Sequence, residues 1–300
     1  MKNRRIFTTG EIVYDIIFRD GQPVAARPGG AMLNSSVSLG RSKLPVSFAG
    51  TCGNDQVGNL IKQFLRDNGV DTSYLHLENA QSIIALAFLD ENYNASYSFY
   101  KGASPPENPS LPEPAEHDIL LFGSFYSVSG PTRHAASKLR SAALKSGSLI
   151  IYDPNFRSSH LSDLEKVKPY IEENIESSVI VRGSDEDFNN IFGTSSASET
   201  WELPCFRNCT ALLYTRSADG VDLCINNNLK HYSVPAIKPV STIGAGDSFN
   251  AGIIAALYEN GAHRSDLAKL SEKAWDMVVK RGIEFSSAVC MSYDNYIPHP

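Results

Sequence analysis

PVSTIGAGDSFNAG, residues 239–252, decides the fold and the candidate site of this 300-residue chain. Gly244 and Gly246 flank an alanine, and each glycine costs backbone entropy that a tight turn or a close approach to the backbone justifies. Downstream of Asp247 the apolar residues recur at helical spacing, and the pattern stops at Asn260-Gly261, a common helix end. The spacing therefore predicts a loop that enters a helix at the GAGD tetrapeptide.

The first N–H groups of such a helix form an anion site. The N–H groups of Gly244, Ala245 and Gly246 have no partner within the helix, and the positive end of the helix dipole lies behind them. This arrangement suits the charge on a phosphoryl group in transfer. Asp247 would repel a bound phosphate unless it is a general base that takes the proton of an attacking alcohol. The local spacing leaves a second interpretation open, in which Asp247 is a helix N-terminal residue favoured by the dipole.

Other nucleotide and metal motifs are missing from the sequence. The dipeptide Gly-Lys never occurs, which excludes a Walker A loop, and Phe249 takes the place of the third glycine in GxGxxG, which disfavours a nicotinamide oxidoreductase. Cys205 and Cys209 are spaced like a metal pair, but no second pair accompanies them. The five scattered cysteines therefore indicate reduced thiols in place of a disulfide framework.

Composition favours an ordinary globular enzyme over a nucleic-acid or membrane protein. The formal charge of -6 gives no basic field for nucleic acid. The N-terminus is basic but lacks an apolar signal region, and no window approaches the ~18 apolar residues of a membrane span. We therefore expect a cytoplasmic protein that binds neither nucleic acid nor membranes.

From about residue 119 the chain alternates apolar strand-like runs with amphipathic helical segments. This alternation predicts βαβ units in an α/β fold, with a mostly parallel sheet covered by helices on both faces. The ligand groups of such a sheet lie at the carboxyl ends of its strands. The runs are DILLFG, SLIIYD, SVIVRG and ALLYTR, and helical segments follow the first two.

The first third of the chain has a different pattern. Residues 12–18 and 83–100 are rich in β-formers, and the polar turn Asp90-Glu91-Asn92 interrupts the second stretch, which predicts a hairpin. We expect these strands to form a small β flap that closes over a cleft, although an antiparallel edge of the main sheet is an alternative. Residues 102–116 carry five prolines and are interpreted as a connector back to the core.

Two motifs in the chain resemble those of the ribokinase/PfkB family of carbohydrate kinases. TIGAGDSFNAG resembles the family's DTTGAGDxFxxG, and residues 28–58, PGGAMLNSSVSLGRSKLPVSFAGTCGNDQVG, resemble its N-terminal GGxxxNxAxxxxxLG and GxDxxG. The likeness covers nearly the whole chain and is greatest to bacterial fructokinases. It implies one ribokinase-like domain over residues 1–300, a three-layer α/β/α fold, and a small β-sheet lid formed by about residues 12–28 and 81–101.

The resemblance also implies roles for individual residues. Asp247 would be the base, and the backbone of Gly244, Ala245 and Gly246 would form the anion hole. The substrate-binding residues implied are Asp15, Gly29, Gly30, Asn34, Phe99, Lys101, Asp153, Asn155 and Arg157. The ATP-binding residues implied are Ser184, Thr215, Ser217, Gly220, Gly244 and Gly246. For Arg157 a surface salt bridge is the alternative.

Two departures from the family pattern concern ions. Ser241 replaces the Asp that opens DTTGAGD and helps to bind a monovalent cation in relatives, which argues against activation by potassium. Residues 184–187, SDED, replace an NxxE stretch tied to magnesium. We expect Mg²⁺ to arrive with ATP, because it prefers phosphate oxygens and water to an all-protein cage, and we name no direct metal ligand.

The resemblance implies transfer of the γ-phosphoryl group of ATP to a monosaccharide, with fructose as our first choice. A 2-keto-3-deoxygluconate kinase is one alternative, but its usual YYR is replaced by Phe99-Tyr100-Lys101, which favours a neutral sugar. Ribose and other sugars also stay open. A non-catalytic sugar- or nucleotide-binding homologue is an alternative from another class, against which the presence of Asp247 argues. The open strand edges of the lid indicate a homodimer that pairs through it.

Overall fold

A nine-stranded sheet forms the centre of the protein, in a computed structural model that describes residues 4–89, 95–226 and 228–299. Seven neighbouring strands run parallel, and an antiparallel pair closes one edge. The predicted alternation of strands and helices from residue 119 is confirmed. In spatial order the strands are β13 (Asn228–Tyr232), β12 (Val221–Ile225), β11 (Ala211–Thr215), β10 (Ile180–Ser184), β9 (Leu149–Asp153), β8 (Ile119–Gly123), β1 (Ile6–Thr9), β4 (Val46–Gly53) and β5 (Leu75–Glu78).

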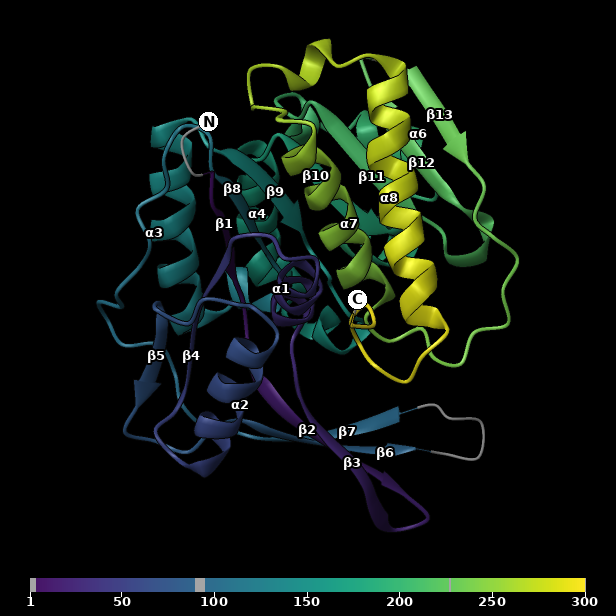
Figure 1. Cartoon of the computed structure of the whole chain (residues 1–300). Coiled ribbons are helices and arrows are strands. Elements are labelled where there is room, and N and C mark those ends of the chain that lie inside the picture. The colour runs from purple at the N-terminus through teal and green to yellow at the C-terminus, as the bar shows by residue number, and fades with distance from the viewer. Residues whose placement is uncertain (1–3, 90–94, 227, 300) are drawn as a thin grey trace.

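Helices cover both faces of this sheet, which gives three layers (Figure 1). Alternate residues of a central strand enter different cores: Ile119 and Leu121 of β8 belong to one buried cluster, and Leu120 and Phe122 to the other. The first cluster is completed by α1 (Ala31–Arg41), α2 (Gln56–Asp67), α7 (Ala245–Glu259) and α8 (Glu272–Cys290). The second is completed by α3 (Gly130–Ser146), α4 (Leu164–Glu176), α5 (Asp185–Phe192) and α6 (Ala197–Trp201).

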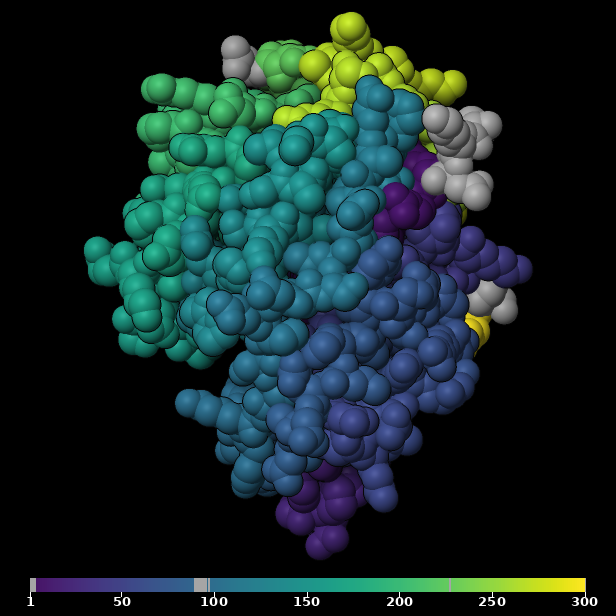
Figure 2. All heavy atoms as spheres, turned by 90° about the vertical axis from the view of Figure 1, so that its left-hand side faces the viewer, coloured from purple at the N-terminus to yellow at the C-terminus, as the bar shows by residue number. Residues whose placement is uncertain are grey.

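A separate four-stranded sheet projects beside the main body, and Figure 2 shows the tip of its first hairpin in purple at the bottom of the molecule. Its strands are β3 (Gln22–Gly29), β2 (Val13–Arg19), β6 (Ile84–Leu89) and β7 (Ala95–Tyr100), in that order. The alternative of an antiparallel edge of the main sheet is therefore wrong. β6 and β7 pair antiparallel, as a hairpin requires, while the predicted turn Asp90-Glu91-Asn92 lies outside the described residues.

The small sheet joins the two stretches of the chain by a parallel pairing of β2 with β6. The sequence predicted a hairpin in residues 83–100 and a flap that also contains residues 12–18, but it gave no sign of this parallel pairing. From β7 the proline-rich segment 102–116 returns to β8 without regular helix or strand, as expected of a connector. Among the described residues no helix is both long and apolar enough to span a membrane.

Candidate active site

The GAGD loop enters α7 as predicted. Gly244 is the N-cap, with φ +80°, and a Cβ there would lie 2.2 Å from the carbonyl oxygen of Asn295. Both the left-handed conformation and the close approach of another backbone therefore require glycine. The helix begins at Ala245, so that Asp247 lies in its first turn, where the backbone N–H groups lack helical partners.

Asp247 is held from α1 by two hydrogen bonds. Asn34 Nδ2 donates to Asp247 Oδ2 at 2.8 Å, and Ser35 Oγ donates to the Asp247 carbonyl oxygen at 2.9 Å. The pKa of Asp247 is raised to about 7, mainly by burial and also by the charge of Asp153, against the opposing effects of the Asn34 hydrogen bond and the charges of Arg157 and Arg182. A buried carboxylate that titrates near neutral pH is suited to general-base catalysis.

The two glycines before α1 lie where the small sheet passes into the main body. Gly29 ends β3, and Gly30, with φ +133°, is the N-cap of α1. A Cβ on Gly29 would lie 2.3 Å from Asp15 Oδ2, so the carboxylate of β2 lies against this turn. Burial raises the pKa of Asp15 to about 6, opposed by the charge of Arg27. The structure thus brings Asp15 to Gly29, and the same turn leads directly into the helix that carries Asn34.

Asp153 lies beneath the site and not on its surface. Its side chain is fully buried at the end of β9. Oδ1 accepts a hydrogen bond from the Asn155 N–H at 2.9 Å, and Oδ2 accepts from Arg182 Nη1 at 3.0 Å and from Asn250 Nδ2 at 2.6 Å. Burial raises the pKa of Asp153, and the Arg182 charge opposes this. Because protein groups take both oxygens, the structure does not support the expected contact of Asp153 with a substrate.

Arg157 is exposed at the start of a short helix, η2 (Ser158–Asp163), after β9. Its charge lowers the pKa of both Asp247 and Glu11, so it lies within electrostatic reach of the candidate base. No acidic side chain among the residues described here lies within ion-pair distance of Arg157. The surface salt bridge considered as an alternative is therefore not seen.

Four of the expected ATP-binding residues lie at or just beyond the carboxyl ends of β10 and β11. Ser184 ends β10 opposite Thr215 of β11, and it caps α5 in a capping box with Asp187. Ser217 and Gly220 follow on the turn to β12, both with positive φ. Thr215 is also linked to the centre of the site, since its Oγ1 accepts from Arg182 Nη2 at 2.8 Å.

Phe99 and Lys101 lie in the last strand of the small sheet and just after it. Phe99 lies in β7 with 64 % of its surface exposed, and Lys101 is exposed just beyond this strand. Both therefore belong to the small sheet and its exit, and they contribute to substrate binding only if this sheet covers the substrate.

The sequence analysis missed three polar residues that the structure places at the site. Arg182 interrupts the apolar run of β10, Asn250 follows Asp247 by one helical turn, and Glu11 follows β1 and accepts from Ser124 Oγ at 2.9 Å. Arg182 and Glu11 could have been recognised from the sequence, because each is a charged residue near the carboxyl end of a buried strand, where ligands bind. For Asn250 the signal was a polar residue on the predicted buried face of the helix.

Within the described ranges, no group of three or more His, Cys, Asp and Glu side chains is placed to hold a metal ion. Ser241 carries no charge, and its Oγ accepts from the Ile243 N–H at 3.2 Å.

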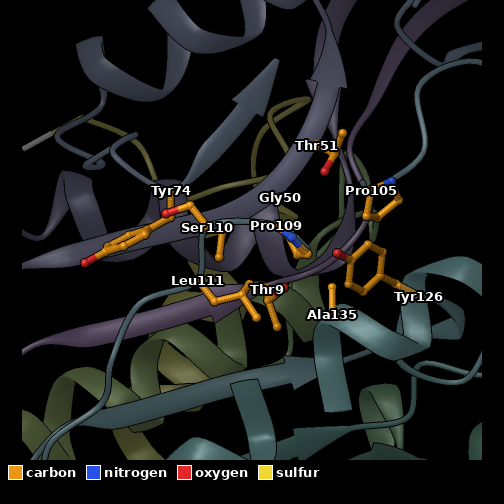
Figure 3. Close-up of a pocket in the computed structure, with 11 residues that line it drawn as sticks. Thr9, Gly50, Thr51, Tyr74, Pro105, Pro109, Ser110, Leu111, Tyr126 and Ala135 are labelled. Carbon is orange, nitrogen blue, oxygen red and sulfur yellow. The ribbon is translucent and has the colours of Figure 1, made fainter. Parts of the chain in front are cut away.

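A small cavity lies next to the site, between the ends of β1 and β4 and the proline-rich connector (Figure 3). Its volume of about 10 Å³ suffices for one water molecule. It is too small for a sugar and contains none of the expected site residues. The lining residues are Thr9, Ala49, Gly50, Thr51, Tyr74, Pro105, Pro109, Ser110, Leu111, Tyr126 and Ala135.

Comparisons with known proteins agree with the resemblance of the motifs. The profile described as pfkB family carbohydrate kinase matches residues 3–294. Fructokinase of Escherichia coli is 26 % identical over 262 residues, which cover 86 % of this chain and 85 % of that protein. The crystal structure of aminoimidazole riboside kinase from Salmonella enterica, complexed with aminoimidazole riboside and an ATP analog, superposes with a TM-score of 0.86 at 20 % identity, covering 99 % of this chain and 97 % of its own. The crystal structure of fructokinase from Vibrio cholerae O395, bound to fructose, ADP and a calcium ion, superposes with a TM-score of 0.84 at 22 % identity. The match covers 98 % of this chain and 94 % of the fructokinase chain.

Proposed function

The chain belongs to the pfkB family of carbohydrate kinases, and from this membership we propose that it transfers the γ-phosphoryl group of ATP to a hydroxyl of fructose. As a member of this family it is a phosphotransferase with an alcohol group as acceptor. The observation that carries the proposal is the position of Asp247, a buried carboxylate with a pKa near 7, in the first turn of a helix, the end at which helices in general favour anions.

The proposed reaction places the sugar hydroxyl between Asp247 and the phosphoryl group. The phosphates bind at the N–H groups of Gly244 and Gly246, since the Ala245 N–H donates to the Thr242 carbonyl oxygen at 3.2 Å. The negative charge that develops on transfer is stabilised at the positive end of α7. Asp247 accepts the proton of the hydroxyl as the oxygen attacks phosphorus. Because the pKa of Asp247 is raised to about 7, this carboxylate changes its protonation state near neutral pH.

An unused acceptor beside Asp247 supports a sugar site at this position. Asn34 Oδ1 is buried and has no hydrogen-bond partner among the described residues, although Nδ2 of the same amide is bound to Asp247. A buried acceptor without a donor is costly, and a sugar hydroxyl placed here satisfies it. Asp15 supplies a second acceptor from the small sheet, because its carboxylate lies against the turn at Gly29, where a Cβ would be 2.3 Å from Oδ2.

In this proposal the small sheet is a lid whose closure brings Phe99 and Lys101 to the sugar, while Arg157 contacts it from the loop after β9 of the main body. The sheet carries large exposed apolar side chains, among them Val24, Phe88 and Tyr100. Exposed apolar surface on a sheet with open edges also favours pairing of two lids in a homodimer. Magnesium, when bound with ATP, neutralises phosphate charge, and the use of ATP is consistent with a cytoplasmic location.

A phosphorylation screen tests this proposal. The enzyme is incubated with ATP and Mg²⁺, and ADP release is coupled to a spectroscopic signal for each of several acceptors. The panel contains fructose, ribose, 2-keto-3-deoxygluconate, aminoimidazole riboside and adenosine. We expect the highest kcat/KM for fructose; a higher value for another acceptor contradicts the choice of sugar, and no turnover with any acceptor contradicts the proposed activity.

A further inference from the structure

A buried arginine lies directly beneath the anion-binding loop. Arg182 is on β10, and only 9 % of its side chain is exposed. A Cβ built on Gly246 would lie 2.6 Å from Nη1, 2.8 Å from Nη2 and 3.0 Å from Cζ of this arginine. The guanidinium group therefore lies against the Cα of Gly246, on the side of the loop that faces the sheet.

Three adjacent strands fix the orientation of this guanidinium. Nη1 donates to Asp153 Oδ2 on β9 at 3.0 Å, and Nη2 donates to Thr215 Oγ1 on β11 at 2.8 Å. Asn250 of α7 donates to the same Asp153 oxygen, so the network also reaches the helix that carries the loop. A planar fork bonded at both ends has little freedom to turn, and arginine keeps its charge throughout the working pH range.

The positive end of this ion pair faces the loop. The three atoms nearest to the Gly246 Cβ position all belong to Arg182, whereas its counter-ion Asp153 bonds to the guanidinium from β9. A buried charge acts through a lower effective dielectric than a surface charge does, so it adds to the positive end of the α7 dipole. Asp153 and Arg157 also act on the pKa of Asp247, the first raising it and the second lowering it.

We propose that Arg182 is a positioning residue for phosphoryl transfer, which supports the GAGD loop from below and stabilises the negative charge that develops on the transferred group. The proposal rests on the proposed kinase function and adds to it a residue that touches neither the sugar nor the nucleotide. Its effect is expected on the transition state more than on the bound substrates, because the charge it opposes grows during transfer.

The test compares the binding of ADP alone with that of ADP and aluminium fluoride, which mimics the phosphoryl group in transfer, in the presence of Mg²⁺ and fructose. In Arg182→Met we expect kcat and the affinity for the aluminium fluoride complex to fall together, by about tenfold to a hundredfold, with ADP affinity kept within about threefold. Arg182→Lys retains the charge and should recover part of both losses. Equal losses for ADP and for the aluminium fluoride complex, or a kcat within about twofold of the parent, would overturn the proposal.

If Arg182→Met does not fold, the same binding measurements are made on a double variant that also removes the charge of Asp153. Arg182→Met leaves Asp153 buried without its counter-ion, whereas Asp153→Asn/Arg182→Met removes both charges and avoids this cost. The double variant should show the same selective loss of the aluminium fluoride complex. If it binds that complex as tightly as the parent does, the charge of Arg182 has no role in transfer.

Arg140→Met is the matched control. Arg140 is a buried arginine on α3 that forms an ion pair with Glu173 and a hydrogen bond to Asn174, both on α4. Its loss should lower the melting temperature and leave the ratio of the two affinities unchanged; a change as large as in Arg182→Met contradicts the proposal. A parent enzyme that phosphorylates no acceptor contradicts the proposed function, whereas an active parent with an unaffected Arg182→Met contradicts only this inference.

Discussion

Replacing Asn34 by leucine should move the pH dependence of the enzyme to higher pH. Asn34 donates the hydrogen bond at 2.8 Å that opposes the rise in the pKa of Asp247, and leucine keeps the volume and the burial while removing the donor. A hydrogen bond to a charged group contributes about 1.5–3 kcal/mol, and one pKa unit corresponds to about 1.4 kcal/mol. The pKa of Asp247 should therefore rise by about 1–2 units from its value near 7.

The assay is the pH profile of kcat/KM for the sugar, whose acid limb reports the essential base of the free enzyme. In the parent this limb should lie near pH 7, with activity lost as the pH falls and Asp247 takes up a proton. Ser35→Ala is the control, because Ser35 Oγ bonds to the carbonyl oxygen of Asp247 and not to its carboxylate. An acid limb that stays in place in Asn34→Leu, or that moves equally in Ser35→Ala, would refute the assignment of the limb to Asp247.

Three further outcomes are expected. Asp247→Asn should stabilise the ligand-free protein by about 4 kcal/mol at pH 8, because the raised pKa makes ionised Asp247 unfavourable for folding above pH 7, an effect that is absent below about pH 4. Thermal unfolding of the parent and the variant at pH 8 and at pH 4 checks this, and an equal gain in stability at the two pH values contradicts it. Gly246→Val should raise the KM for ATP and lower kcat by tenfold or more, because its side chain displaces Arg182; unchanged kinetics count against phosphate binding at this loop. Gly244→Ala should destabilise the fold by about 1–3 kcal/mol in urea unfolding, because φ is +80° and the Asn295 carbonyl lies 2.2 Å from the new Cβ; an unchanged midpoint would show that the backbone relaxes.

The sequence predicted those parts of the fold that depend on local patterns. Helix α7, its end at Asn260-Gly261 and the alternating strands after residue 119 each have a hydrophobic period or a capping residue that marks them. The parallel pairing of β2 with β6 was not predictable in this way, because it joins residues about 70 positions apart and leaves no mark on either strand. Register between distant strands depends on tertiary packing.

At the site, the sequence predicted that the GAGD loop enters a helix at Asp247, but it predicted neither the hydrogen bond from Asn34 to this carboxylate nor the contacts of the buried groups around it. Asp153 follows an apolar strand at the edge where ligands bind, and the sequence does not show that Arg182 and Asn250 both donate to its Oδ2 from two other elements. The direction of a side chain at a strand end depends on its neighbours in the sheet. The supporting network under the loop therefore became visible only in three dimensions.

The most direct test of the account is a comparison of product formation by the parent and by Asp247→Asn, with fructose and ATP as substrates and the sugar phosphate detected by mass spectrometry. Asparagine keeps the shape of the side chain and an acceptor for Asn34 but cannot take up the proton. We predict fructose phosphate from the parent, and a rate at least about 10²-fold lower from the variant with fructose binding retained. Turnover by the variant at a rate close to that of the parent would contradict Asp247 as the base.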